Sequence, residues 1–451
     1  MKMEMVEAIK RAGVVGAGGA GFPTHVKLNA SAEYFLVNAA ECEPLIETDK
    51  FLCRTWPERI VGTVEQIAAH LGAKRAVIAL KAKYEKEIKA LEAAIQKTNA
   101  QVEIFKMRSF YPAGDEQTLV QQVTGRCVPE RGLPLDVGCV VDNVGTVLAI
   151  ADALEGKPVD TKYLSVTGDV ERPLMFHVPI GTPVREVLDA AGARRGSYGL
   201  ILGGPMMGKV LPDEAAIDAA VVTKTTGNLL VLPKDHMLFE RAALSPQRMI
   251  RQAAAACIQC KMCTDLCPRY LIGHEVHPNR VMRSMWKEQT VTDPEEYIRY
   301  FGSAANCCSC GACELFSCPM GLSPRKMNDY IKGRLREKGI QVERNMEPKV
   351  RDGVEIHKIP TERLIARLGL TPYVTHVEPE LREYIPKECR IPLSQHIGRP
   401  AQPVVEAGGE VSQGDQIAQA AEGLSANIHT GVSGVVKQVT DREIIICRKE
   451  E

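Results

Sequence analysis

Two short runs of cysteine constrain this chain more than any other feature of its sequence. Nine of the fifteen cysteines stand in CIQCKMCTDLCP, residues 257–268, and in CCSCGACELFSCP, residues 307–319. Disulfides do not explain them, because bridges belong to oxidising compartments and to small domains that lack a core. This chain has 451 residues, of which 45% are hydrophobic, so it can bury several cores without cross-links. The runs therefore indicate metal ligation.

The spacing within each run is that of an iron–sulfur protein. The first run reads CxxCxxCxxxCP, and the second repeats the triplet but places its last cysteine one residue further along. A triplet of this spacing surrounds one face of a cubane, whereas the fourth cysteine points elsewhere and, in two-cluster ferredoxins, binds the other cluster. We therefore predict that each run lends its last cysteine to the other. One [4Fe-4S] cluster is expected on Cys257, Cys260, Cys263 and Cys318, and another on Cys267, Cys307, Cys310 and Cys313.

Zinc is the alternative metal. Zinc sites usually pair two CxxC knuckles across a longer spacer, whereas each run here holds its ligands within about twelve residues and ends in proline. The spacing favours iron and sulfur. Cys308 is left over, either as a substitute ligand or as a buried neighbour. Nearby cations either offset the negative clusters or are solvated surface charge: Lys261, Arg269, Arg280 and Arg283.

Charge and hydropathy exclude several classes of protein. Lys plus Arg equals Asp plus Glu, at 56 each, so no overall field attracts nucleic acid or anionic lipid. Charges at positions 2, 4, 7, 10 and 11 leave no apolar stretch for a secretory signal, so we expect a cytoplasmic protein. The most apolar window, 137–154, is interrupted by Asp142, Asn143 and Asp152. It predicts a buried helix and no membrane span.

The order of secondary-structure patterns predicts a multidomain α/β protein. Helical patterns alternate with short β-rich runs up to about residue 155, as in a sheet covered by helices. Two further strand-like runs about Gly168-Asp169 precede a helix that opens at Thr182-Pro183, which indicates a β-grasp domain. Ser245 and Pro246 mark the start of a helix that leads into the first cysteine run. After a polar, aperiodic segment, the tail returns to β-rich runs with glycine turns.

A glycine-rich loop near the N-terminus predicts a phosphate-bearing ligand. GVVGAGGAGFPTHVK holds glycines 16, 18 and 21 at GxGxxG spacing, and Glu41 follows about twenty residues on, as the ribose-binding acid of a Rossmann unit would. A Rossmann motif needs a strand before the glycines and a helix after them. Here a helical pattern precedes the glycines and Pro23 follows them. The motif alone therefore disfavours a standard dinucleotide site.

Four motifs in order are more specific than the glycines: GAGGAGFPTHVK, YFLVNAAECEP, YPAGDEQTLVQQVTGR and VDNVGTVLAIADAL. Over residues 10–155 this set resembles the NADH-binding flavoprotein subunit of respiratory complex I and the C subunit of Rnf electron-transport complexes. The resemblance implies that Phe22 and Glu43 meet the nicotinamide nucleotide. It also implies an FMN site formed by Gly16, Gly18, Gly19, Lys27, Asn38, Glu41, Gly114, Asp115, Glu116, Asn143 and Thr146.

The rest of the chain resembles a narrower family. A two-cluster segment after a β-grasp domain is typical of the Rnf type, whereas the complex I flavoprotein has a single-cluster domain. The tail is similar to the barrel-sandwich module of biotinyl and lipoyl carriers, yet no lysine between Pro400 and Val436 can carry either group. That module is N-terminal in the Rnf proteins and C-terminal here. In length and motif order the chain resembles the cobalamin reductases of propanediol-utilisation bacterial microcompartments.

These resemblances give the expected domains. They are an FMN- and NADH-binding α/β domain at 1–158, a β-grasp soluble-ligand-binding domain at 159–240, an α-helical two-[4Fe-4S] ferredoxin-like domain at 241–345, a linker at 346–385 and a barrel-sandwich tail at 386–451. The β-grasp domain is the candidate corrin site.

The implied function is electron transfer from NADH through FMN and the two clusters to cobalamin, taking cob(III)alamin to cob(II)alamin and on to cob(I)alamin for adenosylcobalamin recycling. A flavin converts hydride pairs into single electrons, so we predict no catalytic nucleophile or general base. The implied partners are cobalamin, a cobalamin adenosyltransferase and the shell proteins of a bacterial microcompartment. Met1, Met5 and Ile9 would share one helical face, which either packs on the core or addresses the chain to a shell.

Two alternatives stay open. The first is an Rnf-like electron-input protein that works between NADH and ferredoxin or a membrane partner. The second is a non-catalytic scaffold that is stabilised by zinc and binds partners through its tail.

Overall fold

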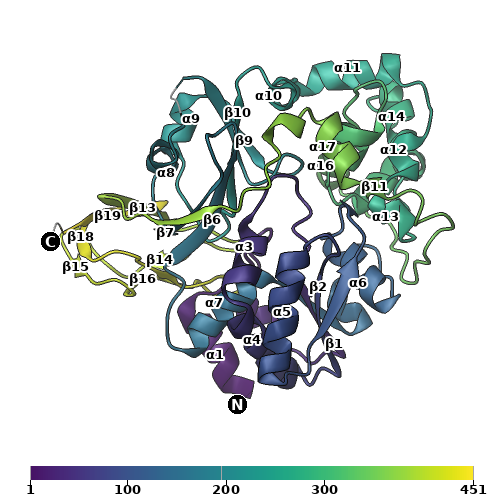
Figure 1. The fold of residues 1–451 in the computed structure, drawn as a ribbon. Helices are drawn as coiled ribbons and strands as arrows, with labels where there is room; N and C mark the ends of the chain where they lie inside the picture. Colours follow the sequence, from purple (N-terminus) through teal and green to yellow (C-terminus); the bar gives the residue numbers. More distant parts are fainter. Residues whose placement is uncertain (1, 194–195, 450–451) are drawn as a thin grey trace.

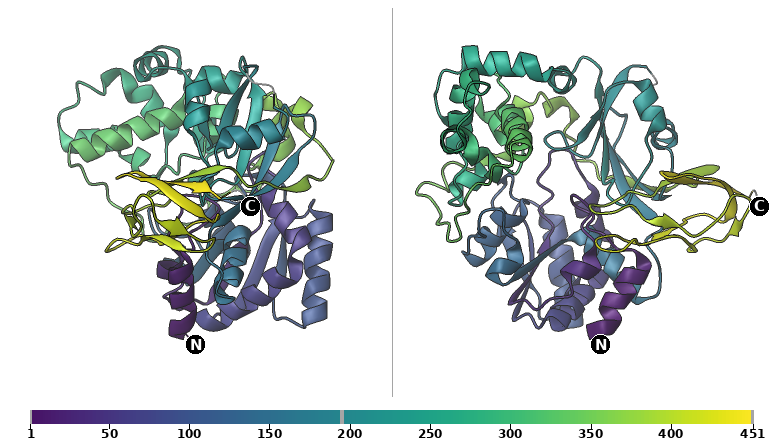
Figure 2. Two further views of the ribbon diagram at one scale, coloured as in Figure 1. Left: turned by 90° about the vertical axis from the view of Figure 1, so that its left-hand side faces the viewer. Right: turned by 180° about the vertical axis from the view of Figure 1, so that it is seen from behind.

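A computed structural model describes residues 2–193 and 196–449. An α/β domain lies at the base of the molecule in Figure 1, with the N-terminus at its lower end. A second sheet and a helical body stand side by side above it, and a small β-sandwich projects from one side. The views in Figure 2 show the same separation from two further directions. The predicted multidomain α/β class is confirmed.

The N-terminal domain is built on a parallel sheet of four strands in the order β3-β2-β1-β5. Its strands are β1 (Tyr34–Asn38), β2 (Arg75–Lys81), β3 (Glu103–Met107) and β5 (Cys139–Asn143). Apolar side chains on both faces are buried, as a parallel sheet between helices requires. The surrounding helices are α1 (Lys2–Ala12), α2 (Thr24–Lys27), α3 (Thr48–Thr55), α4 (Pro57–Leu71), α5 (Glu85–Thr98), α6 (Glu116–Thr124) and α7 (Val144–Leu154), and η1 (Pro134–Val137) is a short 3₁₀ turn.

The apolar window 137–154 was expected to be one buried helix, and that expectation is wrong over its first half. Cys139–Asn143 form β5, which pairs in parallel with β1, and only Val144–Leu154 are helical. The β-branched pair Val140 and Val141 favours the strand, and Asn143 then caps the helix by accepting a hydrogen bond from the Gly145 amide.

The apolar face of α1 packs on the core. Met5 is 8% exposed, Ile9 is fully buried, and both belong to the cluster that contains Val144 and Val147 of α7. Of the three residues expected on this face, Met1 lies outside the described residues. Core packing accounts for the other two.

The second sheet is mixed, with six strands in the order β12-β7-β6-β10-β8-β9. The strands β6 (Thr161–Gly168) and β7 (Leu174–Pro179) form the predicted antiparallel pair, and β10 (Asn228–Pro233) lies parallel to β6. The helix α8 (Val184–Ala190) begins after Pro183, as expected. This domain is completed by β8 (Tyr198–Leu202), β9 (Lys209–Leu211) and α9 (Glu214–Ala219).

The cysteine runs lie in the helical body. Ser245 caps α11 (Pro246–Ala256) by accepting a hydrogen bond from the Arg248 amide, which confirms the predicted start. Short helices then alternate with the cysteine loops around one apolar cluster. They are α10 (Met237–Ala242), α12 (Met262–Asp265), α13 (Pro268–Leu271), α14 (Pro278–Ser284), η2 (Met285–Lys287), α15 (Pro294–Phe301), η3 (Gly302–Asn306), η4 (Ala312–Ser317) and α16 (Pro324–Glu337).

The segment 346–385, which we expected to be a linker, ties the other bodies together. Its strand β11 (Ile359–Pro360) pairs with β4 (Phe110–Tyr111) of the first domain, and β12 (Glu380–Glu383) adds an edge to the second sheet. The helix α17 (Thr361–Arg367) and the turn η5 (Thr371–Tyr373) lie between these two strands.

The tail folds as two facing sheets around its own apolar core. One sheet has the order β13-β19-β18-β15 and the other β14-β16-β17. The strands are β13 (Glu388–Pro392), β14 (Gln402–Pro403), β15 (Glu410–Val411), β16 (Gln416–Gln419), β17 (Ile428–His429), β18 (Gly434–Val439) and β19 (Glu443–Arg448).

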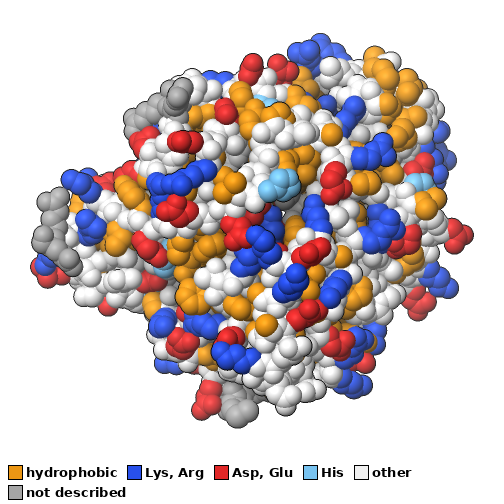
Figure 3. Space-filling view, in the orientation of Figure 1, with side chains coloured by type: hydrophobic (Ala, Val, Ile, Leu, Met, Phe, Trp, Pro, Cys, Tyr) orange, Lys and Arg blue, Asp and Glu red, His pale blue; other side chains and the backbone are white. Residues whose placement is uncertain are grey.

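Acidic and basic side chains are interspersed over the face seen in Figure 3, in keeping with the balanced composition. Among the described residues, no helix has the length and apolarity needed to cross a bilayer.

Candidate functional site

The first part of the site lies where the strand order of the parallel sheet reverses. The strands β2 and β5 flank β1 on opposite sides, and Asn38 and Asn143 are paired in register at the carboxyl ends of β1 and β5. Ligands of open α/β sheets bind in the crevice at such a point. Two residues predicted to meet FMN therefore stand side by side at the expected edge of the sheet.

The glycine loop reaches the same edge from a different direction than a Rossmann loop. It follows α1 and is closed by a bridge between Val15 and Pro23, so no strand leads into it. The Ala17 amide donates to the Thr146 hydroxyl at 2.9 Å. A Cβ atom at Gly18 would lie 3.0 Å from Asn143, whereas one at Gly19 would meet no atom within 4 Å. The loop thus packs on the start of α7 and leaves open space above Gly19, which fits close approach of a flavin nucleotide.

Gly114 and Lys27 complete this edge. Asn38 donates to the Gly114 carbonyl at 2.9 Å, and a Cβ at Gly114 would lie 3.2 Å from the Asn38 side-chain oxygen. The Lys27 ammonium donates to the Val141 carbonyl at 2.7 Å and lies 3.2 Å from Asp142 and 3.7 Å from Glu116. Burial lowers the pKa of Lys27, but these two carboxylates more than offset it and raise the pKa overall. Lys27 therefore stays a cation at this edge.

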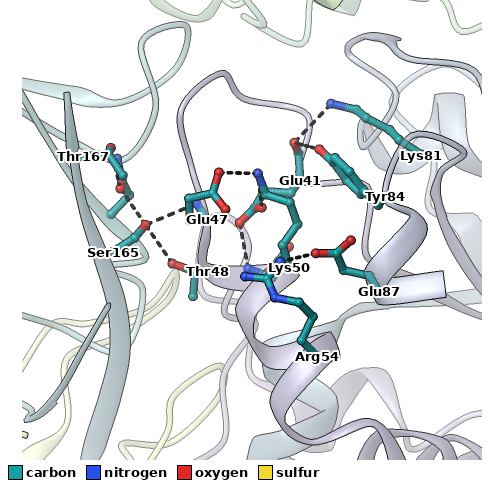
Figure 4. A network of polar contacts seen from close by, with 12 residues as sticks. Glu41, Glu47, Thr48, Lys50, Arg54, Lys81, Tyr84, Glu87, Ser165 and Thr167 are labelled. Carbon is teal, nitrogen blue, oxygen red and sulfur yellow. Dashed lines mark hydrogen bonds and ion pairs between the residues drawn. The ribbon is translucent and has the colours of Figure 1, made fainter. Parts of the chain in front are cut away.

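Glu41 is held by a network that Figure 4 shows from close by. Its backbone adopts φ of 38°, and its carbonyl accepts from Lys81 at 3.2 Å and from Tyr84 at 3.3 Å. Its carboxylate accepts from the Asp49 amide at 2.7 Å and lies 3.8 Å from the Lys50 ammonium. Burial raises the pKa of Glu41 to about 8, so this carboxyl group holds its proton more tightly than an exposed glutamate does.

The two residues expected to meet the nicotinamide nucleotide make contacts within the protein. The Glu43 carboxylate accepts from the amides of Met206 and Met207, each at 2.9 Å, and thereby clamps a loop of the second sheet. Burial raises the pKa of Glu43 to about 7. Phe22 is half-buried, and its carbonyl accepts from the Gly16 amide at 2.9 Å. Glu43 therefore faces the boundary between domains.

The two cysteine runs adopt matching loops in the helical body. Gln259 and Lys261 flank Cys260 with φ of 59° and 68°, and Ser309 and Gly311 flank Cys310 with φ of 57° and 81°. Left-handed residues at the same positions of both triplets turn the backbone around a centre, the kind of concave loop that surrounds phosphate groups and iron–sulfur clusters. Non-glycine residues adopt this conformation only where the surrounding structure enforces it. The loops fit the predicted clusters.

Thiols of both runs lie near one another in the helical body. Burial raises the pKa of Cys263 to about 12, and the neighbouring thiols of Cys257, Cys318 and Cys260 add to the shift. Burial likewise raises the pKa of Cys313, and here Cys307 and Cys267 are the main neighbours. Cys318 thus lies near Cys263 of the first triplet and Cys267 lies near Cys313 of the second, and the exchanged ligation stays a prediction.

The two sets of cysteines differ in exposure. Cys260 is exposed, whereas Cys267, Cys310 and Cys313 are buried. Within residues 2–193 and 196–449, no three His, Cys, Asp or Glu side chains converge closely enough to hold a single metal ion. In a cubane each thiolate binds a different iron atom, so its ligands need not meet at one point.

An ion pair joins the two parts of the site. Asp115 accepts from the Thr118 amide at 3.0 Å, which caps α6, and its other oxygen accepts from Arg269 at 2.8 Å. Arg269 is 9% exposed and lies beside the Cys308 and Cys310 thiols. Of the four cations noted near the cysteine runs, Arg269 is buried, whereas Arg280 and Arg283 are exposed and the Lys261 side chain is 50% exposed. The ion pair connects the flavin side of the molecule to the second cysteine triplet.

The sequence did not single out several residues of this site. Asp49 accepts from Asn143 at 2.7 Å, and Lys81 is 1% exposed beneath the Glu41 loop. A charged residue at the end of the apolar strand RAVIALK was a signal for Lys81, because parallel strands carry their functional side chains at that end. No local pattern marks Asp49.

Comparison with known families assigns the chain four domains in order. The Nuo51 FMN-binding domain matches residues 9–152, the SLBB domain 163–210, the 4Fe-4S dicluster domain 256–323 and the RnfC barrel sandwich hybrid domain 375–450. The chain is therefore built as an FMN and iron–sulfur electron-transfer oxidoreductase. One solved structure, of an NAD⁺-reducing [NiFe]-hydrogenase in the H₂-reduced state, matches with a TM-score of 0.50 and 22% identity over 75% of this chain and 62% of that one, a likeness of fold.

Two kinds of relative match this chain over different shares of its length. The C subunit of an ion-translocating oxidoreductase complex from Pseudomonas aeruginosa is 35% identical over 282 residues, which are 61% of this chain and 34% of that protein. Cobalamin reductase PduS of Citrobacter freundii is 40% identical over 98% of this chain and 96% of its own length. Its counterpart from Salmonella typhimurium is 41% identical over 99% and 96%. With this identity over nearly the whole length of both chains, the chain belongs to the cobalamin reductase PduS family.

Proposed function

We propose that this protein is an NADH-dependent cobalamin reductase that passes electrons from NADH through FMN and two [4Fe-4S] clusters to cobalamin. One observation carries the proposal. The crevice at Asn38 and Asn143 and the second cysteine triplet are joined by the Asp115–Arg269 ion pair, which is 2.8 Å long. A flavin held at the crevice and a cluster held by the triplet would thus be neighbours, as electron hopping between them needs.

The residues at the sheet edge would hold FMN. Bound FMN supplies the exchange between a hydride pair and single electrons. The loop at Gly18 and Gly19 leaves room for close approach of a nucleotide, and Lys27 is a cation within reach of the same edge. Glu41, Asn38, Gly114 and Thr146 belong to the same proposed site, whereas Asp115 acts as a helix cap and ion-pair partner. We propose no catalytic acid or base.

The cysteines would hold two clusters that differ in exposure and in their distance from the flavin side. Bound clusters supply one-electron relays. The set of Cys267, Cys307, Cys310 and Cys313 is joined to the flavin side through Arg269, so we name it the inner set. The set of Cys257, Cys260, Cys263 and Cys318 includes the exposed Cys260, so we name it the outer set. Electrons would therefore enter at the inner set and leave at the outer one.

The other domains would serve substrate and partners. We place NADH near Phe22 and Glu43, and the corrin on the β-grasp domain. The boundaries 1–158, 159–240, 241–345, 346–385 and 386–451 remain our proposed division of the chain. Following the family name, we propose that the protein works in the cytoplasm within a bacterial microcompartment, with a cobalamin adenosyltransferase and shell proteins as partners.

Anaerobic reduction of hydroxocobalamin tests this function. One NADH carries two electrons, so it should convert two cob(III)alamin to two cob(II)alamin and release NAD⁺ and one proton. The cob(II)alamin spectrum should rise with NADH in protein that holds FMN and iron. If NADH bleaches the flavin but the corrin spectrum stays unchanged, cobalamin is not the electron acceptor. If NADH bleaches neither the flavin nor the clusters, NADH is not the electron donor.

The Rnf-like alternative is supported by the 35% identity to the ion-translocating oxidoreductase protein over 282 residues. On that reading ferredoxin replaces cobalamin as the partner of the outer set. Faster electron exchange with ferredoxin than with hydroxocobalamin, under the same conditions, would favour it.

A further inference from the structure

A cavity of about 520 Å³ opens beside the inner cysteine set, away from the flavin side. Its walls come from four parts of the chain: Arg131 from the first domain, Ala305 from η3, Lys332, Leu335 and Arg336 from α16, and Val342 and Arg344 from the segment after that helix. Ligand sites for small molecules commonly have volumes of about 300–1,000 Å³. The cavity is therefore large enough for a small organic ligand.

The charge of its walls is one-sided. Four cationic side chains line the cavity, those of Arg131, Lys332, Arg336 and Arg344, and no Asp or Glu is among the described residues that line it. In the part of the chain that the structure describes, Asp329, 3.7 Å from Lys332, is the one carboxylate paired with these cations. Like charges held together around a hollow are costly unless an anion offsets them. This arrangement differs from the face seen in Figure 3, where the two signs are interspersed.

Arg131 has an unfavourable backbone conformation and a like-charged neighbour. Its backbone has φ of 53°, a left-handed conformation that is unfavourable for a residue other than glycine. Its guanidinium donates to the side-chain oxygen of Asn306 and to the carbonyl of Val342 at 2.7 Å. Burial lowers the pKa of Arg131, and although Glu130 acts against this, Arg344 lowers it further. Arg131 and Arg344 are thus brought together against their repulsion.

We propose that this cavity binds the phosphate or diphosphate group of a small phosphorylated ligand. Guanidinium groups match phosphate oxygens with paired N–H donors. A phosphate monoester carries a charge of about −1.5 to −2 at neutral pH, and a diphosphate carries more, which suits four cations better than a single carboxylate would. Leu335 and Val342 give the cavity an apolar side for the rest of the ligand.

The site also touches the inner cysteine set. Lys332 donates to the Cys307 carbonyl and lies 3.4 Å from the Ser309 hydroxyl within the same loop. An occupant that engages Lys332 would therefore contact the loop that holds the second triplet. The phosphate site itself does not depend on the proposed reductase function.

Calorimetric titration of the anaerobically purified, FMN-saturated protein with inorganic pyrophosphate tests the proposal. Bound FMN fills the phosphate position of the flavin site, and unbound FMN is removed before the titration because this phosphate monoester would compete for the cavity. The wild type should bind pyrophosphate, and the double variant Arg336→Gln/Arg344→Gln should bind it roughly tenfold or more weakly, since a charge-assisted hydrogen bond contributes about 1.5–3 kcal/mol. Both residues are exposed, so the variant should keep its fold. Added KCl should weaken binding by the wild type.

Lys338→Gln is the matched control, because Lys338 follows directly after α16, is exposed and does not line the cavity. It should bind pyrophosphate as the wild type does. The proposal is overturned if the wild type shows no binding, or if the double variant and the wild type bind equally well, which would place the anion elsewhere on the protein.

Discussion

Replacing Asp115 by Asn should destabilise the protein strongly although it changes few atoms. Asparagine caps helices as well as aspartate does, so the bond from the Thr118 amide to this side chain is retained. The ion pair with Arg269 is lost. The two side chains are 13% and 11% exposed and meet at 2.8 Å, and Asp115 is the one carboxylate paired with Arg269 among the described residues.

The size of the effect follows from this burial. Two unit charges about 4 Å apart at an effective dielectric constant near 20 attract by about 4 kcal/mol. Removing one partner of a buried pair costs about 3–5 kcal/mol, because the other charge stays buried and uncompensated. Two further guanidinium nitrogens of Arg269, Nε and Nη1, have no hydrogen-bond partner in the described part of the chain, so no other hydrogen bond of this guanidinium replaces the lost one.

Urea unfolding of anaerobically purified protein measures the loss. With a slope of about 1–3 kcal/mol per molar urea, the midpoint should fall by at least about 1 M. The fluorescence of the two tryptophans, Trp56 in the first domain and Trp286 in the helical body, follows the unfolding of both bodies together. The double variant Asp115→Asn/Arg269→Met should recover most of the loss, since no charge is then left unpaired. A single variant within about 1 kcal/mol of the wild type, or a double variant less stable than the single one, would refute the reasoning.

Three further predictions concern the cysteines, one buried lysine and the glycine loop. Cys318→Ala should abolish the electron paramagnetic resonance signal of the outer cluster and spare that of the inner one; loss confined to the inner cluster would contradict the exchanged ligation. Burial lowers the pKa of Lys224 to about 7, while an unfolded lysine titrates near ~10.4, so between these values the unfolded chain holds the extra proton and stability rises with pH, by up to about 1.4 kcal/mol per unit. Lys224→Met should flatten that rise in urea titrations at pH 7 to 10, and an unchanged slope would show that other groups cause it. Gly18→Ala places a Cβ 3.0 Å from Asn143, and Gly19→Ala places one in the open space proposed for FMN, so both variants should weaken FMN binding, measured by flavin fluorescence; unchanged binding in both variants would contradict a flavin site at this loop.

Local patterns predicted many of the elements of the fold. The alternation of helical and β-rich runs predicted the α/β domain, and Ser245 with Pro246 predicted the start of α11. The window 137–154 was misread because an apolar run fits a buried strand as well as a helix, and only pairing with β1 decides between them.

What the sequence could not predict depends on contacts between distant parts of the chain. Arg269 looked no different from Arg280, yet its pairing with Asp115, 154 positions away, leaves it buried. The Glu43 carboxylate accepts from the amides of Met206 and Met207 in another domain, and nothing in its local sequence indicates these contacts. The cationic cavity joins Arg131 to residues about 200 positions later. No local spacing reports such contacts.

The central claim is that two iron cubanes lie beside a flavin in this chain. Anaerobically purified protein should contain one FMN and about eight irons per chain, and dithionite should produce the paramagnetic signal of two interacting reduced [4Fe-4S] clusters. Zinc in place of iron, or iron without that signal after reduction, would contradict the account.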